Sequence, residues 1–283
     1  VNGMVDRGHE VHLLSATAHG DPLHPDVRFH PLPVAPPLGY VANVSALRRA
    51  LAGLRPDLLH THYASGYGTL ARLSGFAPNV LSVWGSDVYD FPAASPLHRA
   101  LIRGNLAKAD RICSTSEAMA RRTRELLPSA RPTVVPFGID PDVFAPAPDG
   151  AAGATLTIGT VKTLADKYGV DLLIRAFAAL RRELGREHSA WADVLRLRIV
   201  GGGPDEAALR ALVRQEGVEE ATRFEGRVPH ERVPEQLRTL DVYVALSRRD
   251  SESFGVAVLE ASSCALPVVV ADVGGLPEVV EEG

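Results

Sequence analysis

The chain has 283 residues and a mass of 30.2 kDa, a length that typically gives about two domains. Its 46% hydrophobic and 23% charged residues are ordinary for a globular protein and exclude a disordered chain. A net charge of -4 and a pI near 6.2 argue against a nucleic-acid-binding protein, and two cysteines exclude a disulfide scaffold or a cysteine-built zinc site.

The sequence also bears on cellular location. No apolar run approaches the roughly 20 residues that a membrane-spanning helix needs, and no signal peptide is evident at the start. Because few cysteines suit a reducing compartment, we expect a cytoplasmic protein. Peripheral contact with the inner face of the cell membrane is a further hypothesis, for which solvated helix faces are the simpler explanation. It depends on basic residues in predicted helices: Arg48, Arg49, Arg55, Arg121, Arg122 and Arg124.

Short apolar runs alternate with helical patterns along the first half of the chain. Residues 1–11 indicate the end of a helix, a glycine turn and the start of a strand. The strand that should precede this helix is missing, and the chain stops just after a helix start, so we expect a piece of a longer protein. A helix is predicted around 44–54. Strands are predicted at 11–15, 57–62, 80–84, 111–115 and 133–135.

A stretch rich in proline and glycine, 136–153, indicates a linker. The alternation then restarts. Strands are predicted at 156–161, 195–200, 223–225, 242–246 and 267–271, and helices at 169–184, 206–216, 233–239 and 255–264.

This alternation predicts an α/β fold in which helices cover both faces of parallel sheets. The strands are apolar runs, as expected where both faces are buried. We expect two doubly wound, Rossmann-like domains, residues 1–148 and 149–283, facing a cleft. Doubly wound sheets bind ligands at the carboxyl ends of their strands, where the strand order reverses, so the loops that follow the strands are the candidate sites.

The loop and helix after the strand at 242–246 carry the main candidate site. A helix start offers unpaired N–H groups and about half a positive charge, and Gly255 lets the backbone come close to a bound phosphate. Glu252 lies in the loop and Glu260 in the helix, and each carboxylate could accept two hydrogen bonds from sugar hydroxyls. An ordinary capped helix with a solvated glutamate is the alternative.

Two other segments of the second half could bind phosphate. Residues 201–203 form a glycine-rich turn after a strand, but they lack the G-x-G-x-x-G spacing of a dinucleotide site, and an ordinary turn explains them. Lys162 and Lys167 flank the loop after the strand at 156–161. Either lysine could place a charge on a phosphate, and a solvated loop lysine is the alternative for each.

The first half has polar side chains at two strand ends. His60 and His62 are two residues apart on one strand, so they share a face. No third ligand is evident nearby in the sequence, so we expect no metal ion, and acceptor contact and a structural role both stay open. Trp84 and Asp87 follow the strand at 80–84. Asp87 could cap a helix or contact an acceptor.

Together these residues resemble the family 4 glycosyltransferases of GT-B architecture, and the resemblance covers nearly the whole chain. Residues 8–11 match the end of the first helix and the start of the second strand. Residues 135–140 match the crossing segment, with Phe137 in place of the usual asparagine. Residues 252–261 match the Glu-x7-Glu element, and 267–269 and 274–278 match the family's next two conserved segments.

The resemblance implies a retaining, metal-independent transfer, hexosyltransferase-like, from a nucleotide-diphosphate sugar to a glycan, lipid-linked or small-molecule acceptor, as in polysaccharide biosynthesis. No cofactor is implied. Glu260 would hold the donor ribose, Glu252 would contact the donor sugar, and Lys162 and Lys167 would neutralise the departing diphosphate. The other donor-binding residues would be Ser253, Phe254, Gly255, Val256, Gly202 and Val228; Asp87 joins the catalytic set, and the acceptor-binding residues would be His62, Trp84 and Asp87.

The sequence departs from the family pattern within these sites. The family's arginine and lysine fall on Thr163 and Tyr168, so Lys162 and Lys167 are each displaced by one position. The family's acceptor-domain histidine falls on Trp84. Three alternatives stay open: a non-catalytic nucleotide-sugar-binding module, an inactive fragment, and a GT-B nucleotide-sugar epimerase, against which the Glu-x7-Glu element argues.

Overall fold

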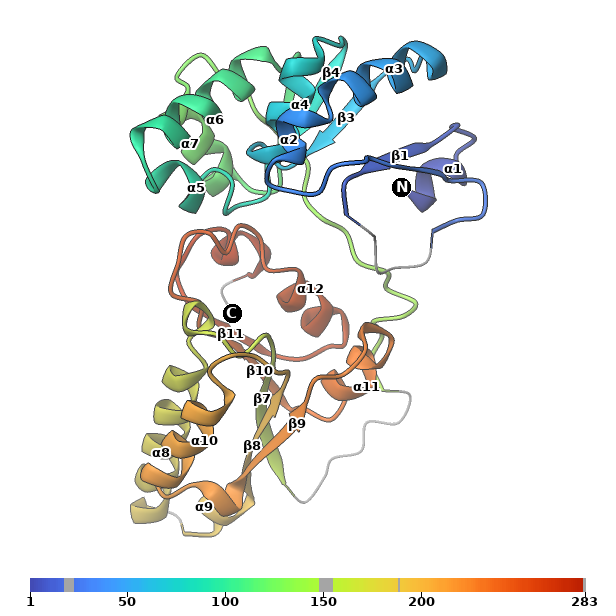
Figure 1. Ribbon diagram of the computed structural model, residues 1–283. Helices are drawn as coiled ribbons and strands as arrows, with labels where there is room; N and C mark the ends of the chain where they lie inside the picture. The colour runs from blue at the N-terminus through green and yellow to red at the C-terminus, as the bar shows by residue number, and fades with distance from the viewer. Residues whose placement is uncertain (18–22, 148–154, 188, 282–283) are drawn as a thin grey trace. The chain divides into compact units, whose positions relative to one another are not determined.

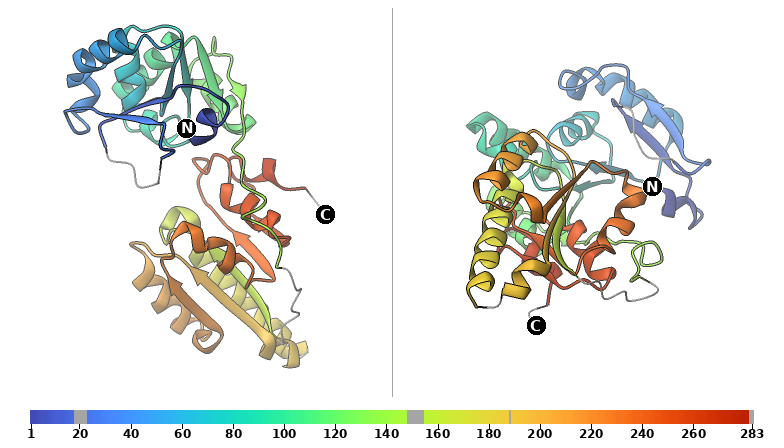
Figure 2. Two further views of the ribbon diagram at one scale, coloured as in Figure 1. Left: turned by 90° about the vertical axis from the view of Figure 1, so that its right-hand side faces the viewer. Right: turned by 90° about the horizontal axis from the view of Figure 1, so that it is seen from below.

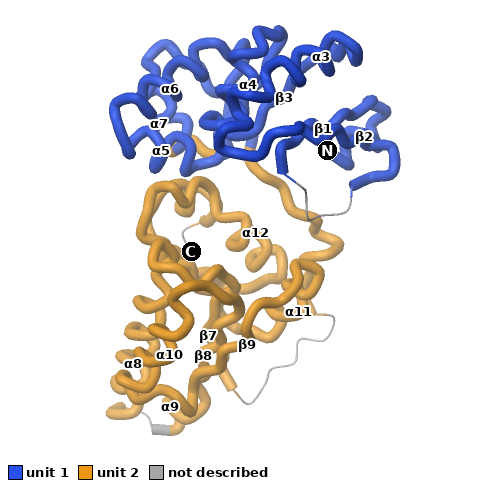
Figure 3. Tube along the Cα trace, in the orientation of Figure 1, with its two compact units in different colours: residues 1–115, 119–135 blue, residues 116–118, 136–283 orange. Residues whose placement is uncertain are grey.

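The computed structural model describes residues 1–17, 23–147, 155–187 and 189–281 (Figure 1). The chain divides into two compact units, coloured separately in Figure 3. Unit 1 comprises residues 1–115 and 119–135, and unit 2 comprises 116–118 and 136–283. The predicted limit between 148 and 149 lies outside the described residues, and the predicted domain limits and cleft stay predictions.

The described strands of unit 1 form two parallel sheets. In the first, β1 (His12–Ser15) pairs with β2 (Arg28–Pro31). The second contains β3 (Leu59–His62), β4 (Asn79–Ser82), β5 (Arg111–Ser114) and β6 (Thr133–Val134) in chain order. The helices are α1 (Asn2–Val5), α2 (Gly39–Ala42), α3 (Val44–Leu54), α4 (Gly66–Ser74), α5 (Asp90–Ala93), α6 (Pro96–Lys108) and α7 (Glu117–Leu126).

Most predicted elements of unit 1 are confirmed, with two differences. The helix predicted at 44–54 is α3, which buries Leu47 and Leu51 one turn apart and ends at Arg55 in a left-handed conformation. The sequence does not indicate β2, because Arg28–Pro31 holds one large apolar residue and ends in proline. The strand predicted at 80–84 occupies Asn79–Ser82 instead, since the chain turns at Gly85.

Unit 2 holds one parallel sheet of five described strands. They are β7 (Leu156–Val161), β8 (Leu195–Val200), β9 (Thr222–Gly226), β10 (Val242–Ala245) and β11 (Val268–Val270). The order is β11-β10-β7-β8-β9. The chain therefore moves from β7 toward one edge and then returns to the other side of β7. The order reverses between β7 and β10, where ligand sites form in doubly wound sheets.

The helices of unit 2 lie on both faces of this sheet (Figures 1 and 2). The α-helices are α8 (Val170–Glu187), α9 (Ser189–Val194), α10 (Glu206–Gln215), α11 (Val233–Leu237) and α12 (Val256–Ser263). Short 3-10 helices are η1 (Asp166–Tyr168), η2 (Glu219–Ala221), η3 (His230–Arg232) and η4 (Leu276–Val279).

Each face of the sheet has its own apolar core. On one face, Ile174 and Phe177 of α8 pack with Leu197 of β8. On the other, Leu237 of α11 and Val258 of α12 share a core with the fully buried Tyr243. Full burial of one such side chain contributes about 1.5–3 kcal/mol, so both faces stabilise the sheet substantially. The predicted α/β class with helices over both faces of a parallel sheet is confirmed. Among the described residues, no helix has both the length and the apolar character needed to cross a bilayer.

Candidate functional site

The loops after β7 and β10 flank the reversal of strand order, and they bring Lys162 and Glu252 together. The Oε1 atom of Glu252 lies 3.2 Å from Lys162 Nζ, and its Oε2 accepts a hydrogen bond from Ser247 Oγ at 3.0 Å. The Lys162 and Glu252 side chains are each only 15% exposed. Because this ion pair is mostly shielded from water, it is stronger than a surface pair. Both oxygens of the Glu252 carboxylate thus have partners in this state.

Tyr168 lies between the two predicted phosphate-binding lysines. The ammonium nitrogens of Lys162 and Lys167 are 4.8 and 4.6 Å from the centre of its ring, within cation–π range. The loop is also tied to the one after β10, because the Arg248 amide donates to the Lys167 carbonyl at 2.8 Å and the Arg248 side chain pairs with Asp166. The residue that stands where the family has lysine therefore holds both displaced lysines against one ring.

Glu260 lies in the second turn of α12 and is almost fully buried, with a side chain only 10% exposed. Its Oε1 is 3.1 Å from Nε2 of His230, which belongs to η3 after β9. The His230 side chain is 72% exposed. Sequence analysis does not find His230, since no sequence spacing relates it to position 260; the contact depends on how α11 and α12 pack on the sheet.

The start of α12 is shaped by apolar contacts as well as by glycine. Gly255 precedes the helix with φ of 89°, and a Cβ there would lie 2.6 Å from Leu276. Phe254 is 6% exposed and meets Phe137 edge-on, with ring centroids 5.7 Å apart. Phe137, which replaces the family's asparagine, therefore supports the loop that leads into the helix. Val256 opens the helix, where the first-turn amides have no partners within the helix.

Two further glycines hold the backbone of the Glu252 loop. A Cβ at Gly274, which has φ of 58°, would overlap the Glu252 carbonyl oxygen, and one at Gly275 would overlap that of Ser253. The Gly275 amide also donates to the Glu252 carbonyl at 3.0 Å. The close approach of this turn thus fixes the peptide groups on both sides of the Glu252–Ser253 bond, while the half-buried Ser253 side chain lies before the helix.

The glycine-rich turn after β8 packs against the lysine loop. A Cβ at Gly201, where φ is 138°, would overlap the Lys162 carbonyl oxygen, and one at Gly203 would overlap that of Leu164. At Gly202 the nearest atom to a Cβ is the Cβ of Arg227, 3.6 Å away, which is ordinary contact. The turn alternative therefore accounts for Gly201 and Gly203. Among the other predicted donor residues, Val228 is partly buried against the core beneath α11 and α12.

We expect Gly201→Ala to lower the free energy of unfolding by about 2 kcal/mol or more, because it combines an unfavourable φ with a backbone overlap. Chemical denaturation measures this change. Gly202→Ala is the matched control, and its effect should stay within about 1 kcal/mol. Equal destabilisation by the two substitutions would contradict the packing role given to Gly201.

An exposed aromatic surface on unit 1 consists of His60, His62 and Trp84. The His62 ring lies 4.2 Å from that of His60 and 5.7 Å from that of Trp84, and Trp84 is 42% exposed. Desolvation, with a smaller contribution from neighbouring His60, lowers the pKa of His62 to about 4. His62 is therefore neutral at pH 7. His60 Nε2 lies 2.8 Å from Ser82 Oγ. The predicted same-face placement of the two histidines is confirmed, and acceptor contact stays a prediction.

Asp87 is completely buried and organises backbone. Its carboxylate accepts hydrogen bonds from the amides of Ala64 at 2.6 Å, Trp84 at 3.0 Å and Gly85 at 2.9 Å. Burial raises the pKa of Asp87, and these amides oppose that rise. The helix-cap alternative is wrong, since two donors precede Asp87 and the third belongs to the loop after β3. With no exposed surface, Asp87 is placed to hold the loops beneath His62 and Trp84.

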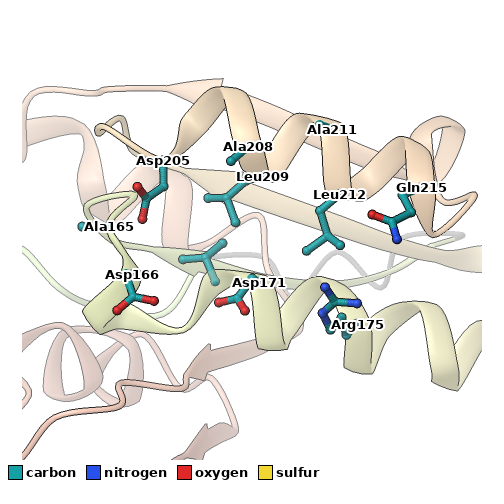
Figure 4. Close-up of a pocket in the computed structure, with 11 residues that line it drawn as sticks. Ala165, Asp166, Asp171, Arg175, Asp205, Ala208, Leu209, Ala211, Leu212 and Gln215 are labelled. Atoms are coloured by element: carbon teal, nitrogen blue, oxygen red, sulfur yellow. The ribbon is translucent and has the colours of Figure 1, made fainter.

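A cavity of about 390 Å³ lies elsewhere on unit 2, between α8 and α10 (Figure 4). Leu209 and Leu212 form part of its lining, with Asp171 and Asp205 near one end. It shares Asp166 with the lysine loop but contains neither Glu252 nor Glu260. Within the described part of the chain, no cluster of three His, Cys, Asp or Glu residues could hold a metal ion.

Two family models match the chain: "Glycosyl transferase 4-like" over residues 1–116 and "Glycosyl transferases group 1" over 147–283. A GDP-mannose-dependent alpha-(1-6)-phosphatidylinositol monomannoside mannosyltransferase of Mycolicibacterium smegmatis is 33% identical over 76% of this chain and 58% of its own length. A D-inositol 3-phosphate glycosyltransferase of Kineococcus radiotolerans is 32% identical over 78% of this chain and 55% of its own. The chain thus spans little more than half of each relative.

Solved structures share the fold. Sucrose-phosphate synthase from Thermosynechococcus elongatus has a TM-score of 0.79 at 22% identity, covering 97% of this chain and 74% of that one. Anabaena HepE, solved with UDP and glucose, has a TM-score of 0.68 at 19% identity over 91% and 71%. Fold and sequence matches define a protein of the GT-B glycosyltransferase class. Within that class, the chain belongs to family 4.

Proposed function

We propose that this chain provides the donor-binding and acceptor-binding parts of a retaining, metal-independent glycosyltransferase that uses a nucleotide-diphosphate sugar. The observation that carries the proposal is the grouping of Glu252, Glu260 and Lys162 around the start of α12, at the reversal of strand order in unit 2. The mannosyltransferase relative is named as GDP-mannose-dependent, and HepE was solved with UDP and glucose, which supports a sugar-nucleotide donor.

The proposed chemistry requires stabilisation of a leaving diphosphate. Negative charge grows on that group as the bond to the sugar breaks, so fixed positive groups beside it lower the barrier. The first-turn amides of α12 are suited to bind the phosphates, and Lys162 and Lys167 supply the cations. These two lysines support a mechanism without a metal ion. Glu252 would accept hydrogen bonds from donor-sugar hydroxyls, and Glu260 from the ribose.

We further propose that unit 1 binds the acceptor through His62 and Trp84. An exposed indole presents a flat apolar face, and the neutral His62 can accept or donate a hydrogen bond, a combination suited to a polyhydroxylated acceptor. Two relatives are named for acceptors that contain inositol, which supports a polyol, free or lipid-linked. Cytoplasmic location and contact with an anionic membrane stay predictions, which fractionation and vesicle sedimentation would test.

A donor and acceptor screen with product identification tests the function. We expect transfer from a nucleotide sugar, retention of the anomeric configuration by NMR, and no loss of rate in EDTA. Donor binding without any transfer would favour the binding-module alternative, and an isomerised donor would favour the epimerase. An inverted product or complete dependence on a divalent ion would contradict the proposed mechanism.

A further inference from the structure

The carboxylate of Glu260 is held from one side only. An ionised carboxylate can only accept hydrogen bonds, so His230 donates to Oε1 from its Nε2. Among the described residues, no hydrogen bond reaches Oε2 of Glu260, whereas Glu252 has partners on both oxygens. Glu260 therefore keeps one nearly buried oxygen for a ligand while His230 occupies the other.

The two side chains are fixed relative to each other by a shared core. Pro229 precedes η3 with φ of -62°, and η3 continues directly into α11. Leu237 of α11 is 1% exposed and lies in the same apolar cluster as Val258 and Ala261, which flank Glu260 on α12. A shift of His230 away from Glu260 would thus require η3 to move relative to this core.

His230 itself contributes little buried surface. Its side chain is 72% exposed, and its ring lies 5.8 Å from that of Phe144. Nothing in the packing of the fold explains an imidazole here, while the hydrogen bond to Glu260 does. A hydrogen bond to a charged, nearly buried group fixes its orientation and offsets part of the cost of burying it.

We propose that His230 is a positioning residue for ribose recognition: it holds Oε1 of Glu260 so that Oε2 faces the vicinal hydroxyls of a ribonucleoside diphosphate. This inference rests on the proposed function, in which Glu260 binds the donor ribose. His230 would not touch the reacting atoms. Because its effect acts on ground state and transition state alike, it should change the donor KM far more than kcat.

Calorimetry on the full protein tests this role, with UDP, GDP and their 2′-deoxy counterparts as probes. We expect His230→Ala to weaken binding of the preferred ribonucleotide about tenfold and to weaken its 2′-deoxy form much less, so that discrimination between them falls. His230→Gln, which keeps an N–H donor, should restore part of the discrimination. Glu231→Ala, on the same turn, is the matched control and should behave as the unchanged protein. With donor sugar, kcat should change less than about threefold.

The outcomes separate the two proposals. If the unchanged protein binds the ribonucleotide and transfers sugar, but His230→Ala leaves ribose discrimination intact, the positioning role is overturned and the proposed function stands. A loss of kcat with unchanged KM would also overturn it. If the unchanged protein binds none of the four nucleotides, the donor site itself is disproved, and the role of His230 with it.

Discussion

Glu260→Ala is expected to lower kcat/KM for the sugar-nucleotide donor by about 10²–10⁴. Two hydrogen bonds to a charged acceptor contribute roughly 1.5–3 kcal/mol each, and each 1.4 kcal/mol corresponds to a factor of ten. The side chain is 10% exposed, so water replaces the lost carboxylate poorly. Steady-state kinetics with the donor varied, together with donor affinity by calorimetry, measures the effect.

The matched control is Glu260→Gln, which keeps the shape and one oxygen acceptor and should retain more donor affinity than alanine. Circular dichroism and thermal unfolding of both variants establish that α12 still folds, since Glu260 is flanked by the buried Leu237 cluster. Sugar transfer at the original rate by Glu260→Ala would remove the basis for placing the ribose at this carboxylate.

Lys162→Met should lower kcat about 10²–10³-fold, the size of effect seen when one charge-stabilising group is removed from a reaction centre. The substitution keeps most of the side-chain volume but leaves Glu252 without its cation, 3.2 Å away in the unchanged protein. Lys167→Met should have a smaller effect, because Lys167 is exposed and solvent screens its charge. Single-turnover rates at saturating donor measure both.

Lys108→Met serves as the control, since that lysine lies on α6 of unit 1. A double-mutant cycle of Lys162→Met with Glu252→Gln separates the two functions of the lysine, because a shared pairing makes the effects non-additive. If Lys162→Met and Lys108→Met have equal kcat, the leaving diphosphate does not depend on Lys162.

The sequence alone predicts unit 2 closely. The strands Leu156–Val161 and Leu195–Val200 are found at their predicted bounds, because each is an unbroken apolar or alternating run with polar or glycine residues at its ends. Arg28–Pro31 escapes prediction since its strand character comes only from pairing with β1. Local pattern thus suffices where burial sets the residue types, and fails where a neighbouring strand does.

The candidate site shows the same division. Glu252 and Glu260 are readable from the sequence, because both lie within one loop-helix segment whose chemistry is local. The partners of these acids, Lys162 and His230, lie 90 and 30 residues away from them, and only the sheet order brings them close. Gly274 looks like part of a motif in the sequence, yet its overlap with the Glu252 carbonyl depends on how distant turns meet.

The Lys162–Glu252 ion pair bears on how the site would empty after each reaction. An incoming diphosphate would take the ammonium group of Lys162 away from Glu252, and the freed carboxylate would then be available to the sugar hydroxyls. When the spent nucleotide departs, the two side chains can close on each other again, 3.2 Å apart. Dissociation would therefore not strand an isolated cation in a poorly hydrated spot, which favours release of the product over its retention as an inhibitor.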